Sequence, residues 1–172
     1  MSDVIRFGGV TRVQRTFAFV DVSGFTAYTD REGDAAAVEL LETVRGLIRR
    51  LASMHGVRIA KWLGDGAMIV GVEPEPVIES VVAMIDANTQ VLELRAGVAE
   101  GDVILFEGDD HIGQVINLAA RLSDIAEPGQ ILAPKEMMTS LLVNTKATPA
   151  GEKNVPGIQT AVQVVQLESH SM

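Results

Sequence analysis

The chain has 172 residues, of which 47% are hydrophobic and 22% are charged, a formal net charge of −9, and no cysteine. These totals predict one globular domain without disulfides or thiolate metal sites, and the acidity argues against a nucleic acid or an anionic membrane as partner, because basic surfaces bind both. No apolar run approaches the roughly 20 residues of a membrane-spanning helix, and the first residues lack the apolar segment of a secretory signal, so we expect a cytoplasmic protein.

The first half of the chain predicts a strand, a helix and a hairpin. Residues 16–22 (TFAFVDV) form a short apolar, β-prone run that contains one aspartate. Residues 34–54 carry apolar side chains at spacings of three and four with arginines mostly between them, which is typical of an amphipathic helix. Two β-rich runs, 57–63 and 67–72, flank Gly64-Asp65-Gly66, whose composition suits a hairpin turn.

The second half predicts further helices and strands in an order that defines a fold class. The expected elements are a helix at 77–90, a strand at 94–106, a helix at 114–125, a strand at 130–133, a short helix at 135–142 and a strand at 160–167. The order strand, helix, strand, strand, helix, strand, followed by additions, is the βαββαβ pattern of a ferredoxin-like α+β fold. This fold alone does not identify a function.

Two aspartates occupy positions that suit metal binding. Asp21 lies within an apolar strand, where a charge is unfavourable unless it is paired or binds a metal. By itself it could equally be a strand-end aspartate bonded to nearby backbone, and Asp65 by itself is better explained as a turn former. If the first strand lies beside the hairpin, the two carboxylates can approach a shared pair of metal ions, the arrangement used in phosphoryl chemistry.

The segment after Asp21 has features of a ligand-binding turn. Gly24 permits close approach of the backbone to a ligand, and the start of a following helix offers free N–H groups to a phosphate. Ser23, Gly24 and Phe25 are therefore candidate substrate contacts, although S-G-F is also a common strand-to-helix turn.

Four polar residues elsewhere have ordinary explanations when each is taken alone. Asn117 and Arg121 are four residues apart and share one helix face, where Arg121 could be a solvated surface cation and Asn117 a weak point of the helix. Asp110 precedes that helix and would pass as a turn or helix N-terminal charge. Lys61 would pass as an exposed strand lysine.

Taken together and in order, these positions resemble the catalytic domain of class III adenylyl and guanylyl cyclases. F-V-D-V-S-G-F (19–25) is similar to the family's first metal motif, and K-W-L-G-D-G (61–66) to its K-x-x-G-D hairpin. D-H-I-G-Q-V-I-N-L-A-A-R (110–121) is similar to its D-x-x-G-x-x-x-N-x-x-x-R helix entry. The resemblance covers about residues 15–167 and implies a fold of class III cyclase type. We accordingly expect an N-terminal arm (1–14), a catalytic domain (15–168) and a tail (169–172).

The resemblance implies a metal centre and a shared active site. Asp21 and Asp65 match the metal-binding aspartates, with the Val22 carbonyl as a possible further ligand, so we expect two divalent ions, Mg²⁺ or Mn²⁺. In this family the site lies at a head-to-tail dimer interface. A homodimer would therefore have two equivalent sites, each with metal carboxylates from one chain and the remaining residues from the other.

The resemblance also assigns the residues of the second set. Lys61 and Asp110 match the pair that reads the base, Asn117 the residue that orients the ribose, and Arg121 the residue that stabilises charge developing at the α-phosphate. A lysine only donates and an ionised aspartate only accepts, which complements N1 and the N6 amine of adenine and mismatches guanine. The predicted activity is an adenylyl cyclase that converts ATP to 3′,5′-cyclic AMP and pyrophosphate by attack of the ribose 3′-hydroxyl.

Two positions depart from the family pattern. Asp102 stands where many members place a cation after G-x-x-x-G, and Pro156-Gly157 stands where a phosphate-binding lysine often precedes a glycine. Lys153 is close by and is a candidate substitute. A catalytically weak, cyclase-like regulatory domain that binds nucleotide therefore remains an alternative. GTP as substrate is disfavoured by Lys61 and Asp110, and a diguanylate-cyclase-like enzyme by the lack of a G-G-D/E-E-F turn.

Overall fold

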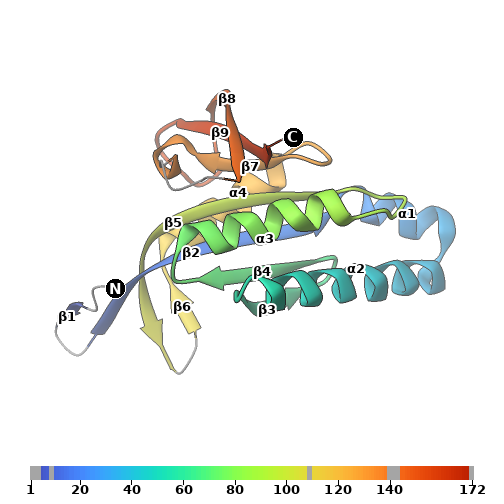
Figure 1. Ribbon diagram of the computed structural model, residues 1–172, viewed down its shortest axis with the longest axis horizontal. Coiled ribbons are helices and arrows are strands. Elements are labelled where there is room, and N and C mark those ends of the chain that lie inside the picture. The colour runs from blue at the N-terminus through green and yellow to red at the C-terminus, as the bar shows by residue number, and fades with distance from the viewer. Residues whose placement is uncertain (1–4, 8–9, 108–109, 139–143, 171–172) are drawn as a thin grey trace.

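One mixed sheet organises the protein, with helices on both of its faces (Figure 1). The computed structural model describes residues 5–7, 10–107, 110–138 and 144–170. The strands are β1 Ile5–Phe7, β2 Val10–Val22, β3 Arg58–Leu63, β4 Gly66–Gly71, β5 Leu94–Phe106, β6 Asp110–Ile112, β7 Ile131–Pro134, β8 Thr145–Lys153 and β9 Val162–Ser169. The helices are α1 Phe25–Glu32, α2 Asp34–Met54, α3 Pro74–Ala87 and α4 Gln114–Ile125, with a 3-10 turn, η1, at Lys135–Met137. No helix in these described segments is both long and apolar enough to span a membrane.

The sheet topology confirms the predicted ferredoxin-like core. Its strand order is β3-β4-β2-β5-β7-β9-β8, and the β3-β4-β2-β5 portion is antiparallel throughout. The C-terminal additions extend it from β7, which pairs with β5 in parallel. The register sets Asp21 opposite both Gly66 of β4 and Arg95 of β5. Residues far apart in the sequence therefore meet at the end of the first core strand.

The alternation of side chains along β2 divides the interior into two layers. Val20 and its even-numbered neighbours pack in the cluster that includes Val44 and Ile48 of α2 and residues of α3. Phe17 lies on the opposite face and packs with Ala119 of α4. A period of two along the strand thus places α2 and α3 on one face and α4 on the other.

Several elements differ from the sequence expectation, among them β2, β8 and η1. β2 begins at Val10, inside the segment predicted to be an arm, because its polar first half still pairs with β1 and β5. β8 was not predicted because it is polar and contains a proline, which edge strands tolerate. It lies at the edge of the sheet and has a register shift between Pro149 and Glu152. The predicted helix 135–142 is only the turn η1 where it is described, and residues 139–143 lie outside the described residues.

Candidate active site

The two predicted metal carboxylates lie together at the end of β2. Asp21 faces the β3–β4 turn that carries Asp65, and the Val22 N–H donates to the Asp65 carbonyl oxygen at 3.1 Å. Gly66 makes this approach possible, because a Cβ there would collide with the Val20 carbonyl oxygen and lie 2.8 Å from the Asp21 Cβ. Both carboxylates line a cavity of about 220 Å³, whose other walls include residues of α4.

Burial favours the protonated, neutral form of both carboxyl groups. It is the largest effect on the pKa of Asp21 and raises it above 3.8, although the hydrogen bond and charge of Arg95 lower it. Burial likewise raises the pKa of Asp65. Each carboxylate also repels the other, which adds to the rise at Asp21. A cation bound in this cavity would relieve both effects, so the site is electrostatically suited to one.

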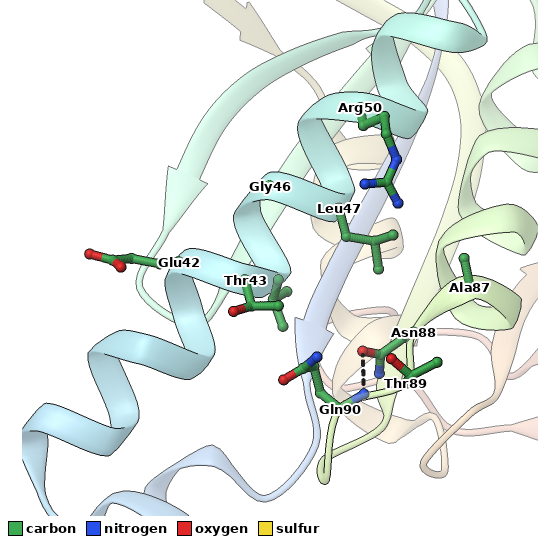
Figure 2. A pocket seen from close by; sticks show the side chains of 10 residues that line it. Glu42, Thr43, Gly46, Leu47, Arg50, Ala87, Asn88, Thr89 and Gln90 are labelled. Atoms are coloured by element: carbon green, nitrogen blue, oxygen red, sulfur yellow. Dashed lines mark hydrogen bonds between the residues drawn. The ribbon is translucent and has the colours of Figure 1, made fainter.

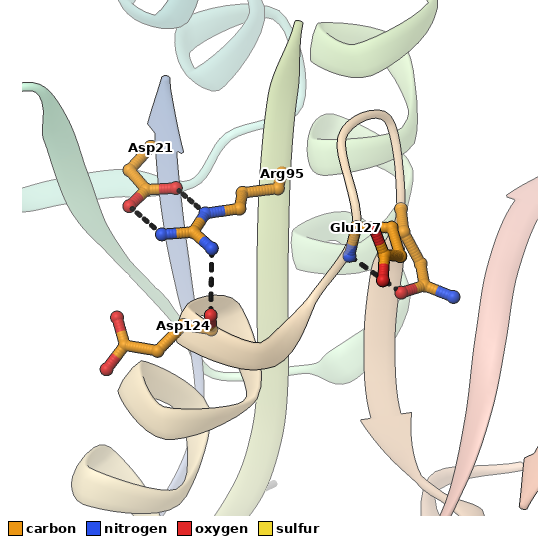
Figure 3. A network of polar contacts seen from close by, with 5 residues as sticks. Asp21, Arg95, Asp124 and Glu127 are labelled. Atoms are coloured by element: carbon orange, nitrogen blue, oxygen red, sulfur yellow. Dashed lines mark hydrogen bonds and ion pairs between the residues drawn. The ribbon is translucent and has the colours of Figure 1, made fainter. Parts of the chain in front are cut away.

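Arg95 is a member of this site that the sequence analysis missed. Its Nε donates to Asp21 Oδ1 at 2.9 Å and its Nη2 to Asp21 Oδ2 at 3.3 Å, while its Nη1 donates to the Asp124 carbonyl oxygen at 2.8 Å (Figure 3). The Arg95 and Asp21 side chains are only 27% and 22% exposed. The available signal was a charged residue in the otherwise apolar start of strand 94–106, which is the same signal that identified Asp21.

The predicted base-reading residues also lie together. Lys61 of β3 and Asp110 of β6 form an ion pair of 3.7 Å between Nζ and Oδ1, with 56% and 59% of their side chains exposed. β6 reaches this position through its antiparallel pairing with β5, in which Asp110 lies opposite Phe106. The pair therefore presents a donor and an acceptor side by side to solvent.

Asn117 and Arg121 lie on the exposed face of α4 and do not line the carboxylate cavity. Arg121 Nη1 makes a 3.4 Å contact with Asp124 Oδ2, and its side chain is 54% exposed. Lys61 and Asp110 are likewise absent from the cavity lining. One chain thus brings together the two carboxylates, and separately the base-reading pair, but leaves the α4 residues directed outward.

The turn after β2 is built from the three predicted substrate contacts. The Ser23 N–H donates to the Glu93 carbonyl oxygen at 2.8 Å, and Ser23 Oγ is buried without a hydrogen-bond partner in the described part of the chain. Gly24 adopts φ 72°, a left-handed conformation that favours glycine, immediately before α1. Phe25 begins α1 and packs against the core under α2 and α3. Its inward position makes it a structural support of the turn.

The residues that depart from the family pattern, Asp102 and Pro156-Gly157, do not line the carboxylate cavity. Asp102 is exposed on β5 opposite Gln14, and neither Asp102 nor Lys153 lines the carboxylate cavity. The Arg95 guanidinium, by contrast, contacts Asp21.

A larger hollow of about 310 Å³ lies between α2 and the segment after α3 (Figure 2). Its lining includes Glu42, Arg50 and Gln90, with Arg50 and Gln90 reaching toward the gap from opposite walls. Asp21 and Asp65 do not line it. The candidate active site is therefore the smaller cavity at the end of β2, because the paired carboxylates lie there.

Comparisons with known proteins show which family this chain resembles. Residues 12–169 match the family described as the adenylate and guanylate cyclase catalytic domain. An uncharacterized protein of Mycobacterium tuberculosis is 33% identical over 155 residues, which are 88% of this chain and 40% of that protein. A pH-sensitive adenylate cyclase of the same species is 32% identical over 74% of this chain and 32% of its own length.

A solved structure of the adenylyl cyclase CyaB from P. aeruginosa shares the fold, with a TM-score of 0.83 at 24% identity over 94% of this chain and 97% of that one. The chain spans 40% or less of the length of the two mycobacterial relatives. The family match covers almost the whole chain and contains the carboxylate pair, the Lys61–Asp110 pair and α4. The chain belongs to the adenylate and guanylate cyclase catalytic domain family.

Proposed function

We propose that this domain is an adenylyl cyclase, which converts ATP to 3′,5′-cyclic AMP and pyrophosphate. The observation that supports ATP over GTP is the adjacency of Lys61 and Asp110, whose charged atoms lie 3.7 Å apart. Adenine offers an acceptor at N1 and a donor at N6, so a donating lysine beside an accepting aspartate matches it. Guanine offers the reverse arrangement, which would leave both groups unpaired and so be rejected.

The donor set at the end of β2 fits a pair of Mg²⁺ or Mn²⁺ ions. Asp21 and Asp65 supply oxygen ligands, which these ions prefer, and the Val22 carbonyl is a candidate third ligand. Among the described residues there is no group of three or more His, Cys, Asp or Glu able to hold a metal. Two carboxylates are sufficient when waters and substrate phosphates complete the coordination, as is usual for Mg²⁺. Divalent ions bound there would lower the pKa of the ribose 3′-hydroxyl and neutralise the triphosphate.

Arg95 is the proposed resident cation for the phosphates. Its guanidinium contacts Asp21, which lines the carboxylate cavity, in a chain that has aspartate at position 102 and proline and glycine at 156 and 157. When a divalent ion binds Asp21, Arg95 would exchange its carboxylate partner for a phosphate oxygen. A planar guanidinium suits that exchange because it binds carboxylate and phosphate with the same fork geometry.

A second copy of the chain would complete the site in a head-to-tail homodimer. Arg121 and Asn117 lie on the outward face of α4 and do not line the cavity of their own chain. In the dimer, Asn117 would orient the ribose and Arg121 would meet charge that grows at the α-phosphate during attack by the 3′-oxygen. Because that charge develops only in the transition state, Arg121 should act on kcat more than on KM.

Product identification with exchanged base-reading residues tests the proposal. The purified chain is incubated with ATP or GTP and Mn²⁺ or Mg²⁺, alongside a double variant, Lys61→Glu with Asp110→Cys. The wild type should form cyclic AMP, and the double variant should lose most of that activity and favour GTP. No cyclic nucleotide from either chain would instead support the nucleotide-binding regulatory domain. Unchanged ATP preference in the double variant would refute the base-reading role.

A further inference from the structure

The turn that carries Asp65 is held from outside the sheet by a side chain of α2. Arg45 Nη2 donates to the Gly64 carbonyl oxygen at 3.1 Å, across a sequence separation of 19 residues. Figure 1 shows α2 running beside β3 and β4, the two strands that this turn connects. Gly64 has φ 49°, a left-handed conformation. The contact therefore anchors the backbone of a tight turn immediately before the proposed metal ligand.

The same arginine takes part in a stack on the strand that leads into the turn. The guanidinium carbons of Arg45 and Arg49 each lie 4.9 Å from the centroid of the Trp62 ring. The arginines are four residues apart and so project from the same side of α2. Trp62 thereby ties β3 to α2 by contacts between cation and ring.

Trp62 and Lys61 lie on opposite faces of β3. β3 has a register shift between Ile59 and Lys61, and such bulges redirect the side chains that follow them. Successive side chains then alternate, so a tryptophan directed toward α2 puts Lys61 on the opposite face. On that face Lys61 meets Asp110.

Arg45 and Arg49 differ in their burial and in their contact with the turn. Arg45 is half-buried and bonded to the turn, whereas Arg49 is exposed and, within the described residues, stacks on the ring without a hydrogen bond or an ion pair. The opposite wall of this part of α2 borders the hollow of Figure 2, lined by Gly46 and Leu47 among others. The buried face of α2, which includes Val44 and Ile48, holds the helix itself, so the arginine contacts act on the hairpin rather than on the helix.

We propose that Arg45 is a positioning residue for the active site, which holds Asp65 through the Gly64 carbonyl and directs Lys61 through the Trp62 ring. Its effect on catalysis rests on the proposed function, but its effect on metal binding does not. Residues that support metal ligands from behind commonly change metal affinity 10- to 100-fold when they are replaced.

The test compares Arg45→Gln with Arg49→Gln, which each remove one cation from the same ring. Binding of Mn²⁺ without nucleotide is measured by electron paramagnetic resonance of the free ion, and acrylamide quenching reports on Trp62, the chain's single tryptophan. Arg45→Gln should weaken Mn²⁺ binding about tenfold. Arg49→Gln should increase quenching equally yet leave Mn²⁺ affinity within about twofold, because it does not touch the turn.

Arg45→Lys provides a second variant should the glutamine variant fold poorly. A lysine can keep the contact with the ring and donate one hydrogen bond, so it should recover part of the lost Mn²⁺ affinity. Equal losses in the Arg45→Gln and Arg49→Gln variants, or no loss in either, would overturn the proposal, as would a wild type that binds no Mn²⁺. If the expected difference in Mn²⁺ affinity is found but the wild type forms no cyclic nucleotide, the proposed function fails and the positioning role stands.

Discussion

Replacing Arg95 with glutamine should separate the stability of the metal-free domain from its affinity for metal and for nucleotide. The guanidinium donates three hydrogen bonds of 2.8 to 3.3 Å, two of them to Asp21. Their loss leaves a half-buried carboxylate without its counter-charge, which should lower the free energy of unfolding by about 2 kcal/mol. For a domain of this size that corresponds to a fall in Tm of about 4–8 °C.

Arg95→Gln should strengthen the binding of Mn²⁺ and weaken the binding of ATP. Without Arg95, Mn²⁺ no longer competes with a bidentate guanidinium for Asp21, so the affinity for Mn²⁺ alone should increase. The KM for ATP should rise, because the cation proposed to receive the phosphates is gone.

Calorimetric titration with Mn²⁺, steady-state kinetics and thermal unfolding without metal measure the three effects. Arg121→Gln is the matched control for stability, since its 3.4 Å pair with Asp124 is exposed and should contribute less than about 1 kcal/mol. Weaker binding of both Mn²⁺ and ATP to Arg95→Gln would refute the competition, because it would mean that Arg95 holds Asp21 in the geometry that binds metal.

Three further outcomes follow from the site. Because burial raises the pKa of Asp65, its carboxyl group binds a proton more tightly in the folded than in the unfolded chain. Without metal, the contribution of Asp65 to the free energy of unfolding should therefore fall as the pH rises above 3.8. In urea unfolding, Asp65→Asn should make the free energy of unfolding depend less on pH. Gly66→Ala should lower the free energy of unfolding by about 1–3 kcal/mol, whereas Gly46→Ala, with nothing within 4 Å of its new Cβ, should raise it by about 1 kcal/mol. Mixing Asp21→Ala and Arg121→Ala chains should restore part of the lost cyclase activity; demonstrated heterodimers without activity would contradict a shared site.

Strong periodicity made parts of the fold predictable. The predicted bounds of α2, β5 and α4 are those of the structure, because a sustained pattern of apolar spacing leaves little choice of element. The sequence was less informative about which side of α2 faces the core. Val38 shares the apolar spacing of residues 34–54 but is 54% exposed, whereas Leu40 is buried. The spacing permits several rotations of the helix, and packing against α3 and the sheet selects one of them.

The candidate site was predictable where a charged residue interrupts an apolar segment of the sequence. A charge in an apolar strand identified Asp21, and the hairpin order brought Asp65 near it. Arg95 carried the same signal but was passed over, because its importance depends on lying opposite Asp21 in the strand register, which spacing along the chain does not reveal. The Arg45–Gly64 contact was beyond sequence reasoning for a related reason, since it depends on how α2 lies against the turn.

The charges of the proposed site are arranged in pairs of unequal strength within one chain. Lys61–Asp110 and Arg121–Asp124 are exposed pairs at 3.7 Å and 3.4 Å, which contribute about 0–1 kcal/mol and are easily rearranged by a ligand or a second chain. Asp21–Arg95 is shorter, bidentate and more buried, so opening it requires more free energy. We therefore expect loading of the carboxylate site with metal, rather than contact with the base, to be the step that most changes the stability of the single chain. Saturating Mn²⁺ should raise Tm more than saturating ATP added without metal.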